Sequence, residues 1–324
     1  MTKAIRFHQT GGPEVLRLDD VDVGEPKGSQ ILVRHTAIGL NYIDTYHRSG
    51  LYPLPLPSMI GMEAAGVVLE TGPEVNDIKS GDRIAYACPP PGSYCEERLI
   101  EAENVVIIPS GVTDELAAAM MLKGLTAQYL IRQIYKVSSN DTILIHAAAG
   151  GVGLIVCQWA KALGATVIGT VSTEEKAILA RSNGCDHAIL YTEEDFSARV
   201  LDITNGAKLP VVFDSIGNDT FEKSLDCLRP LGTMVSFGQA SGPIPPVDLG
   251  VFAQKGSLFF TRPTLFNYAD TASNLRTMSD DLFKAVASAK VKIHIEQKFA
   301  LSEARAAHEA LEARQTTAST ILVP

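Results

Sequence analysis

Cysteine is scarce in this 324-residue chain, and the few cysteines present are unevenly spaced. There are five, an odd number, and no two of them form a Cys-x-x-Cys pair. A disulfide framework needs paired cysteines, and a thiolate zinc site usually takes closely spaced ones. The sequence therefore argues against both, and we expect a protein of the reducing cytoplasm.

We also expect no leader, and the chain has neither an uninterrupted apolar span nor an excess of positive charge. Its first residues contain no apolar core of the kind a signal peptide needs. The most apolar stretch, residues 143–171, is broken by His146, Gln158, Lys161 and several glycines, which indicates a buried core. With 28 basic and 37 acidic residues the formal net charge is −9, so we expect neither nucleic acid nor a membrane as partner.

What remains is ordinary globular material, 46% apolar and 20% charged, and its length suggests two domains. The first hundred residues show short alternating runs separated by Gly, Pro and Asp clusters, which predicts a small β barrel or sandwich. From residue 142 onward, continuous apolar segments alternate with amphipathic ones. That alternation predicts an α/β domain whose parallel sheet is covered by helices on both faces.

The pattern predicts these elements in some detail. The strand candidates from residue 142 onward are 142–147, 166–171, 187–191, 210–215, 233–238 and 257–261, and the helix candidates between them are 152–163, 174–182, 193–203 and 218–228. An earlier helix should begin after Thr113 as its N-cap and break or kink at Gly124. Near the C-terminus we expect helices at 267–288 and 302–314, then a strand at 319–324. That last strand could extend the parallel sheet or return to the N-terminal β domain.

The strongest local motif is the glycine turn at residues 147–153, Ala-Ala-Ala-Gly-Gly-Val-Gly, which follows a strand and opens a helix. In a dinucleotide-binding turn, Gly150 would let the backbone approach the pyrophosphate and Gly153 would let helix and strand pack closely. The free N–H groups of the helix would face the phosphates. Ala148 replaces the first glycine of the pattern, and a tight turn without ligand is the alternative interpretation.

The end of the next strand favours NADPH over NADH. NAD sites usually place an acidic residue there, about 20 residues after the glycines, to hold the ribose 2′-hydroxyl. This chain has Ser172, whose hydroxyl can donate to a 2′-phosphate, and Lys176 could supply the cation. Glu174 and Glu175 point the other way, but we interpret them as first-turn acids behind the N-cap Thr173.

These segments resemble the zinc-independent quinone oxidoreductase branch of the medium-chain dehydrogenase/reductase superfamily, the zeta-crystallin-like NADPH-dependent enzymes. The likeness runs through the whole chain and includes AIGLNYIDTYHRSGLYP (37–53), GMEAAGVV (61–68), AAAMMLKGLTAQYL (117–130), residues 147–173, FDSIG (213–217), GTMVSFGQ (232–239) and FFTRPTL (259–265). It implies a GroES-like β-barrel domain, formed by residues 1–123 and 263–324, and a Rossmann doubly wound sheet in residues 124–262. It also implies a homodimer joined through the edge strand at Ser257–Thr261.

The resemblance further implies a set of cofactor contacts. The matching positions are Asn41, Tyr42, Asp44, Lys123, Thr126, Gly150, Gly151, Val152, Ser172, Lys176, Tyr191, Ser215, Phe237, Gly238, Thr261, Arg262, Pro263 and Arg314. The residues alone leave other roles open. Lys123 could be a helix-face lysine, Tyr191 a strand-end tyrosine, and Arg314 a cation in the last turn of a helix.

Compared with the zinc alcohol dehydrogenases of the same superfamily, the metal ligands are missing. Asn41 lies in the region of the first zinc cysteine, and Met62 replaces the histidine of the Gly-His-Glu segment. A thioether is a poor zinc ligand beside thiolate and imidazole. We therefore expect no metal.

A metal-free site suits a quinone, whose reduction yields an aromatic ring and needs little acid catalysis. Catalysis would then rest on proximity and orientation, while the cofactor supplies the chemistry. We name no firm catalytic acid, and Tyr42 and Tyr52 are the candidates for substrate contact or proton delivery. The alternatives are an NADPH-dependent alkenal or enone reductase and a crystallin-like cofactor-binding protein of low turnover.

Overall fold

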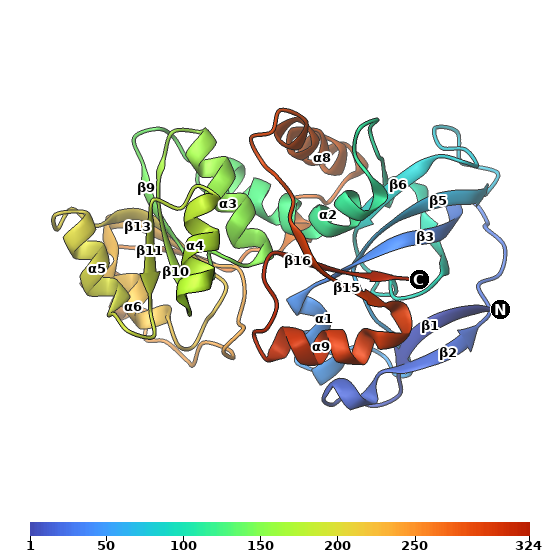
Figure 1. The fold of residues 1–324 in the computed structure, drawn as a ribbon, viewed down its shortest axis with the longest axis horizontal. Coiled ribbons are helices and arrows are strands. Elements are labelled where there is room, and N and C mark those ends of the chain that lie inside the picture. The colour runs from blue at the N-terminus through green and yellow to red at the C-terminus, as the bar shows by residue number, and fades with distance from the viewer. The chain divides into compact units, whose positions relative to one another are not determined.

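The computed structural model describes residues 1–324 and divides into two compact units. The first unit comprises residues 1–125, 269–287 and 293–324, and the second comprises residues 126–268 and 288–292. The blue N-terminal strands and the red C-terminal elements thus belong to one unit, although they are far apart in sequence (Figure 1).

The first unit is built mainly from β-strands. Its strands are β1 (Thr2–Phe7), β2 (Arg17–Val21), β3 (Gln30–Leu40), β4 (Ser58–Met59), β5 (Glu63–Thr71), β6 (Arg83–Ala87), β7 (Glu97–Glu101), β8 (Val106–Ile107), β15 (Ile295–Ala300) and β16 (Ser319–Val323). Its helices are α1 (Tyr42–Ser49), α8 (Ala272–Ala287), α9 (Ala304–Glu312) and most of α2 (Asp114–Tyr129), with short turns η1 (Pro13–Val15), η2 (Ala102–Asn104) and η5 (Leu301–Glu303). A seven-stranded sheet in the order β15-β16-β3-β5-β6-β8, with β7 also on β3, lies beside the small sheet β2-β1-β4.

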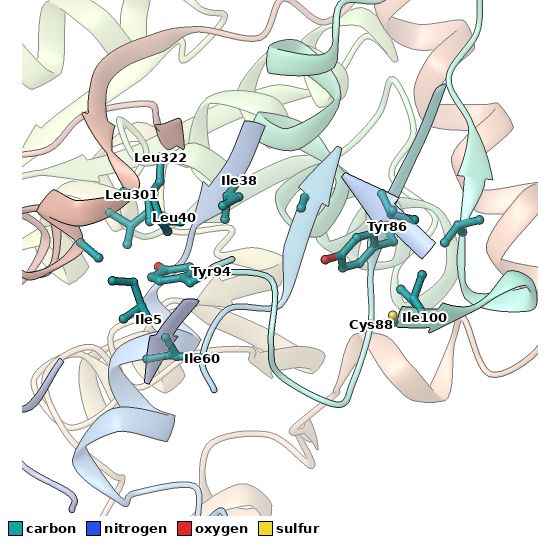
Figure 2. Packing of buried hydrophobic residues seen from close by; sticks show 14 of the residues in the cluster. Ile5, Ile38, Leu40, Ile60, Tyr86, Cys88, Tyr94, Ile100, Leu301 and Leu322 are labelled. Carbon is teal, nitrogen blue, oxygen red and sulfur yellow. The ribbon is translucent and has the colours of Figure 1, made fainter. Parts of the chain in front are cut away.

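The last strand returns to the N-terminal β unit. β16 pairs antiparallel with β3, with Leu322 opposite Ile38. Leu301 and Leu322 gather with Ile38 and Leu40 in the apolar core of this unit (Figure 2). Of the two arrangements that the sequence left open, the return to the first domain is therefore the correct one.

Helix α2 begins as predicted but does not break. The Thr113 hydroxyl oxygen accepts a hydrogen bond from the N–H of Leu116 at 3.2 Å, which confirms the N-cap. The predicted break at Gly124 is wrong, because the helix continues from Asp114 to Tyr129. A kink at this position stays a prediction. A Cβ at Gly124 would lie 2.6 Å from the Leu282 side chain, so the glycine allows α8 to approach closely.

The second unit contains a parallel sheet of six strands. Its elements are β9 (Thr142–Ile145), α3 (Gly151–Ala162), β10 (Thr166–Val171), α4 (Glu174–Ser182), β11 (His187–Leu190), α5 (Phe196–Ile203), β12 (Leu209–Asp214), α6 (Phe221–Asp226), β13 (Leu228–Ser236), α7 (Gly250–Gln254) and β14 (Phe259–Thr261), with short turns η3 (Leu130–Ile134) and η4 (Leu265–Asn267). The strand order β11-β10-β9-β12-β13-β14 is the doubly wound Rossmann order. The order in which strands are added to the sheet reverses between β9 and β12, and in such sheets ligands bind beyond the carboxyl ends of the strands at that point.

Candidate cofactor and substrate site

The glycine turn lies at this reversal point, between β9 and α3. Gly150 is the N-cap of α3 and offers no capping side chain, so the first N–H groups of the helix remain available to a phosphate. A Cβ at Gly153 would lie 2.3 Å from the carbonyl oxygen of Ala147. Glycine is therefore required at that position, as the motif predicts, for close packing of helix and strand.

Ala148 fits in place of the first motif glycine because the neighbouring strand carries a glycine opposite it. A Cβ at Gly169 of β10 would lie 2.5 Å from the Cβ of Ala148. The N–H of Ala148 also donates to the carbonyl oxygen of Thr170 at 3.1 Å. The alanine therefore packs under β10 without disturbing the turn.

The end of β10 gathers the residues expected around a 2′-phosphate. Ser172 follows the strand, and Lys176 lies in the first turn of α4, where its N–H reaches the Thr173 hydroxyl oxygen at 3.4 Å. The N–H of Tyr191 donates to the Val171 carbonyl oxygen at 3.2 Å, which sets Tyr191 beside the same strand end. The structure thus brings Ser172, Lys176 and Tyr191 to one place.

The acidic residues that argued for NADH are engaged elsewhere. Thr173 caps α4, as predicted, with Glu174 and Glu175 in the first turn. Glu174 forms an ion pair with Arg181 on the same helix. Since this carboxylate already has a cationic partner, it has less reason to bind a ribose hydroxyl.

The ends of β12 and β13 carry the other predicted contacts of this unit. A Cβ at Gly238 would lie 2.5 Å from the Ser215 carbonyl oxygen, and the N–H of Phe237 donates to the Asp214 carbonyl oxygen at 2.8 Å. Beside them, Arg262 follows Thr261, the last residue of β14, and precedes Pro263. A side-chain N–H of Arg262 donates to the Ser236 carbonyl oxygen at 2.8 Å. Thr126, at the start of the unit, is hydrogen bonded to Tyr129.

A buried polar network, which the sequence reasoning did not identify, fixes these strand ends. Ser224 and Thr220 donate to the Asp214 carboxylate at 3.2 and 2.7 Å. Because the Ser224 proton is used in this way, His146 Nε2–H donates to Ser224 at 2.9 Å, and His146 Nδ1 accepts from Thr170 at 2.8 Å. Burial lowers the pKa of His146 and keeps the ring neutral. The only sequence signal was a histidine in an apolar strand.

The remaining candidate residues lie in the first unit, where two of them contact the fully buried Glu63. One carboxylate oxygen accepts from the N–H of Leu122 at 2.7 Å. The other accepts from Asn41 Nδ2 at 2.7 Å and from Lys123 Nζ at 3.3 Å. Lys123 Nζ also donates to the Leu40 carbonyl oxygen at 3.0 Å. Asn41 and Lys123 therefore share a carboxylate oxygen, a connection that sequence spacing could not reveal.

Asp44 caps the first turn of α1 and stands at the end of a donor chain that runs from Arg48 through His308 of α9 to Tyr94. Its Oδ2 accepts from the N–H of Asn41 and from the Tyr94 hydroxyl, both at 2.9 Å. Arg48 donates to His308 Nδ1 at 2.9 Å, so His308 Nε2 carries the proton and donates to Tyr94 at 3.2 Å. Burial raises the pKa of Asp44 to about 7, although the Asn41 and Tyr94 hydrogen bonds and the Lys123 charge oppose this.

The two tyrosine candidates belong to one aromatic row. The ring of Tyr46 lies 5.7 Å from that of Tyr42 and 5.3 Å from that of Tyr52, between ring centroids. Burial is the largest cause that raises the pKa of Tyr42, and the negative charge of Glu312 raises it further. The positive charge of Arg314 acts in the opposite direction. Tyr42 is therefore not poised to ionise, and the ring of Tyr46 is tilted by 58° to that of Tyr42 and by 66° to that of Tyr52.

The residues at the position of the zinc ligands do not fit a metal. Both oxygens of Glu63 accept N–H hydrogen bonds, and one of the donors is an ammonium group. Met62 is buried, and its thioether is a poor zinc ligand. His, Cys, Asp and Glu side chains nowhere form a group of three or more able to hold a metal ion.

Comparison with known proteins agrees with this geometry. Residues 27–138 match the family model "Alcohol dehydrogenase GroES-like domain", and residues 151–280 match "Zinc-binding dehydrogenase". A quinone oxidoreductase of Pseudomonas aeruginosa is 55% identical over 100% of both chains. A 2-haloacrylate reductase of a Burkholderia species is 48% identical over 100% of this chain and 99% of that protein.

Solved structures give the same result. The Escherichia coli quinone oxidoreductase complexed with NADPH is 49% identical and matches with a TM-score of 0.98 over 99% of this chain and 100% of its own. A GroES-like β unit joined to a Rossmann sheet with a glycine turn defines a medium-chain dehydrogenase/reductase. Within that superfamily, the chain belongs to the zinc-independent, zeta-crystallin-like quinone oxidoreductases. The predicted fold class and family are confirmed.

Proposed function

We propose that this chain is an NADPH:quinone oxidoreductase that works without a metal. The observation that carries the proposal is the Rossmann sheet in which Ser172 follows β10 and Lys176 lies in the first turn of α4, in a chain 55% identical to a quinone oxidoreductase throughout its length. A serine and a lysine suit a 2′-phosphate, while Glu174 is held by Arg181. NADPH, when bound, supplies the hydride.

The predicted contacts divide between the two units. In the second unit, Gly150, Gly151 and Val152 bind the pyrophosphate through backbone N–H groups. The adenosine end is held by Ser172, Lys176 and Tyr191, and the nicotinamide half by Thr126, Ser215, Phe237, Gly238, Thr261, Arg262 and Pro263. The first unit contributes Asn41, Tyr42, Asp44, Lys123 and Arg314.

A direct assay tests the proposal. The purified protein is titrated with NADPH and with NADH while cofactor fluorescence is followed, and 1,4-benzoquinone is then added to the NADPH complex. We expect preferential binding of NADPH and quinone-dependent oxidation well above the uncatalysed rate. Tight binding without oxidation by any quinone would refute the activity but not the fold.

A second activity is supported by one relative. A solved structure of a 2-haloacrylate reductase also matches, with a TM-score of 0.88 and 46% identity over 99% of both chains. An activated alkene accepts hydride as a quinone does. The same assay with 2-chloroacrylate and with an α,β-unsaturated ketone separates the activities, and we expect the quinone to react faster.

The edge strand β14 supports a homodimer. Phe259 and Phe260 are 60% and 41% exposed on this strand, which pairs on one side only, with β13. An exposed apolar edge is an aggregation hazard unless another strand covers it, and a second copy of the chain would do so symmetrically.

We place the protein in the cytoplasm, because all five cysteines are free. No helix is long and apolar enough to cross a membrane.

A further inference from the structure

We infer that Lys123 is a catalytic residue, whose ammonium group binds a carbonyl oxygen of the quinone and gives that oxygen its proton. The inference rests on the proposed quinone reduction and deepens it. The proton then comes from Lys123 and not from Tyr42 or Tyr52. The sequence suggested Lys123 only as a cofactor contact.

The first argument is the number of donors on Nζ. An ammonium group has three N–H donors. In the protein Nζ donates to the Leu40 carbonyl oxygen at 3.0 Å and to Glu63 Oε2 at 3.3 Å. The residue is only 7% exposed, so water cannot freely solvate the third N–H. A buried ammonium is costly unless its donors are used, and a bound carbonyl oxygen would use the third.

The second argument is that Glu63 holds the ammonium in place. The carboxylate cannot swing away, because its oxygens also accept from the Leu122 N–H and from Asn41 Nδ2, both at 2.7 Å. The charged groups that face Lys123 are Glu63 from β5 and Asp44 from α1. The Glu63 carboxylate lies 3.3 Å from Nζ and gives the buried ammonium an ionic partner in a nearly water-free setting.

The third argument is position. The zinc alcohol dehydrogenases hold their metal in the segments that contain Asn41 and Met62, and in this chain Asn41 shares Glu63 Oε2 with the ammonium. Asn41 also begins α1, the helix that carries Tyr42 and Tyr46 of the aromatic row. A flat quinone on this row would therefore lie next to a fixed cation, the role that a metal fills in the zinc enzymes.

The chemistry balances. Addition of a hydride brings two electrons and one hydrogen to the quinone and leaves the hydroquinone monoanion. The Nζ–H bond of Lys123 breaks as an O–H bond forms, which gives the neutral hydroquinone, and the amine regains a proton from solvent.

The test uses a double variant, because Lys123→Met alone leaves the buried Glu63 carboxylate without its cation and endangers folding. Glu63→Gln/Lys123→Met removes both charges and keeps the side-chain sizes. Glu63→Gln alone keeps the ammonium and reports the effect of the carboxylate. Lys79→Met removes an exposed lysine of the same unit and is the matched control.

The first readout is sensitivity to the basicity of the product. Without the Lys123 ammonium to bind the oxyanion, the rate of reduction should fall most for the quinones whose hydroquinone anions are most basic. We expect kcat of the double variant, measured at saturating NADPH, to fall about 100-fold with tetramethyl-1,4-benzoquinone and less than about tenfold with tetrachloro-1,4-benzoquinone. Equal losses with both quinones would overturn the inference.

The second readout needs no turnover. The phenol 4-nitrophenol is titrated spectroscopically while bound to the wild-type protein and to the double variant. A fixed ammonium should lower the pKa of the bound phenol in the wild type by roughly one unit or more relative to the variant. Identical pKa values would overturn the inference. If the wild type reduced no quinone at all, the proposed function would fail, and this titration would still decide whether Lys123 binds a phenolate.

Discussion

Ala148 in the glycine turn and Gly169 on the neighbouring strand occupy one shared space. A Cβ on Gly169 would lie 2.5 Å from the Cβ of Ala148 and 2.8 Å from the sulfur of Cys185. The methyl group that the turn carries in place of a motif glycine is thus accommodated by a glycine on β10. Ala148 and Gly169 therefore pack as a pair beneath the turn that is expected to bind the pyrophosphate.

Gly169→Ala should therefore destabilise the second unit. Overpacking a buried site typically costs roughly 1–3 kcal/mol. The reciprocal variant Ala148→Gly/Gly169→Ala should recover part of this loss, since only the contact with Cys185 then remains. Thermal unfolding of the three proteins measures the effect, and a double variant no more stable than Gly169→Ala would refute the pairing.

Ser172→Asp should shift cofactor preference from NADPH towards NADH. A carboxylate repels a 2′-phosphate and accepts from a 2′-hydroxyl, so the ratio of kcat/KM for the two cofactors should fall about tenfold to a hundredfold, the scale of one hydrogen bond to a charged group. Glu174→Gln is the matched control, because Glu174 is paired with Arg181. A shift of similar size towards NADPH on Glu174→Gln would mean that this acid, and not Ser172, faces the ribose.

Local patterns in the sequence predict the second unit well. Continuous apolar strands, the Thr173 cap and the glycine turn are set by contacts between residues close in the chain. Gly124 shows the limit of such reasoning. Glycine weakens a helix locally, but here Leu282, far along the chain, packs against it and helix α2 continues.

The polar networks could not be predicted for the same reason. Glu63, Asn41 and Lys123 meet only because β5, the start of α1 and α2 come together in the folded unit. Likewise, His308 reaches Tyr94 across a separation of 214 residues. A single sequence shows each of these side chains as an isolated polar residue in an apolar segment, and nothing in it shows which partner satisfies them.

Phe259→Lys should convert the protein to a monomer if β14 is the dimer edge. The residue is 60% exposed, so a lysine there costs the isolated chain little, whereas two charges meeting across a strand pair repel. Sedimentation velocity of wild type and variant measures the change. Leu249→Lys, at a position 76% exposed outside the strand, is the control and should remain dimeric.

Asp44 should make stability depend on pH in a direction opposite to that of a salt-bridged carboxylate. Burial raises its pKa to about 7 in the folded chain, against about 3.9 when unfolded. Between these values the folded state holds a proton that the unfolded state has lost, so the contribution of Asp44 to stability falls as pH rises from 4 to 7 and stays constant above that.

Asp44→Asn removes this titration while keeping an oxygen that can accept from the Asn41 N–H and the Tyr94 hydroxyl. Relative to wild type, the variant should gain stability as pH rises from 4 to 7, by an amount on the order of a few kcal/mol. Urea unfolding of both proteins at several pH values gives this difference directly. A difference that stays constant from pH 4 to 8 would show that Asp44 ionises in the folded protein as readily as in the unfolded chain, with its burial offset by the donors around it.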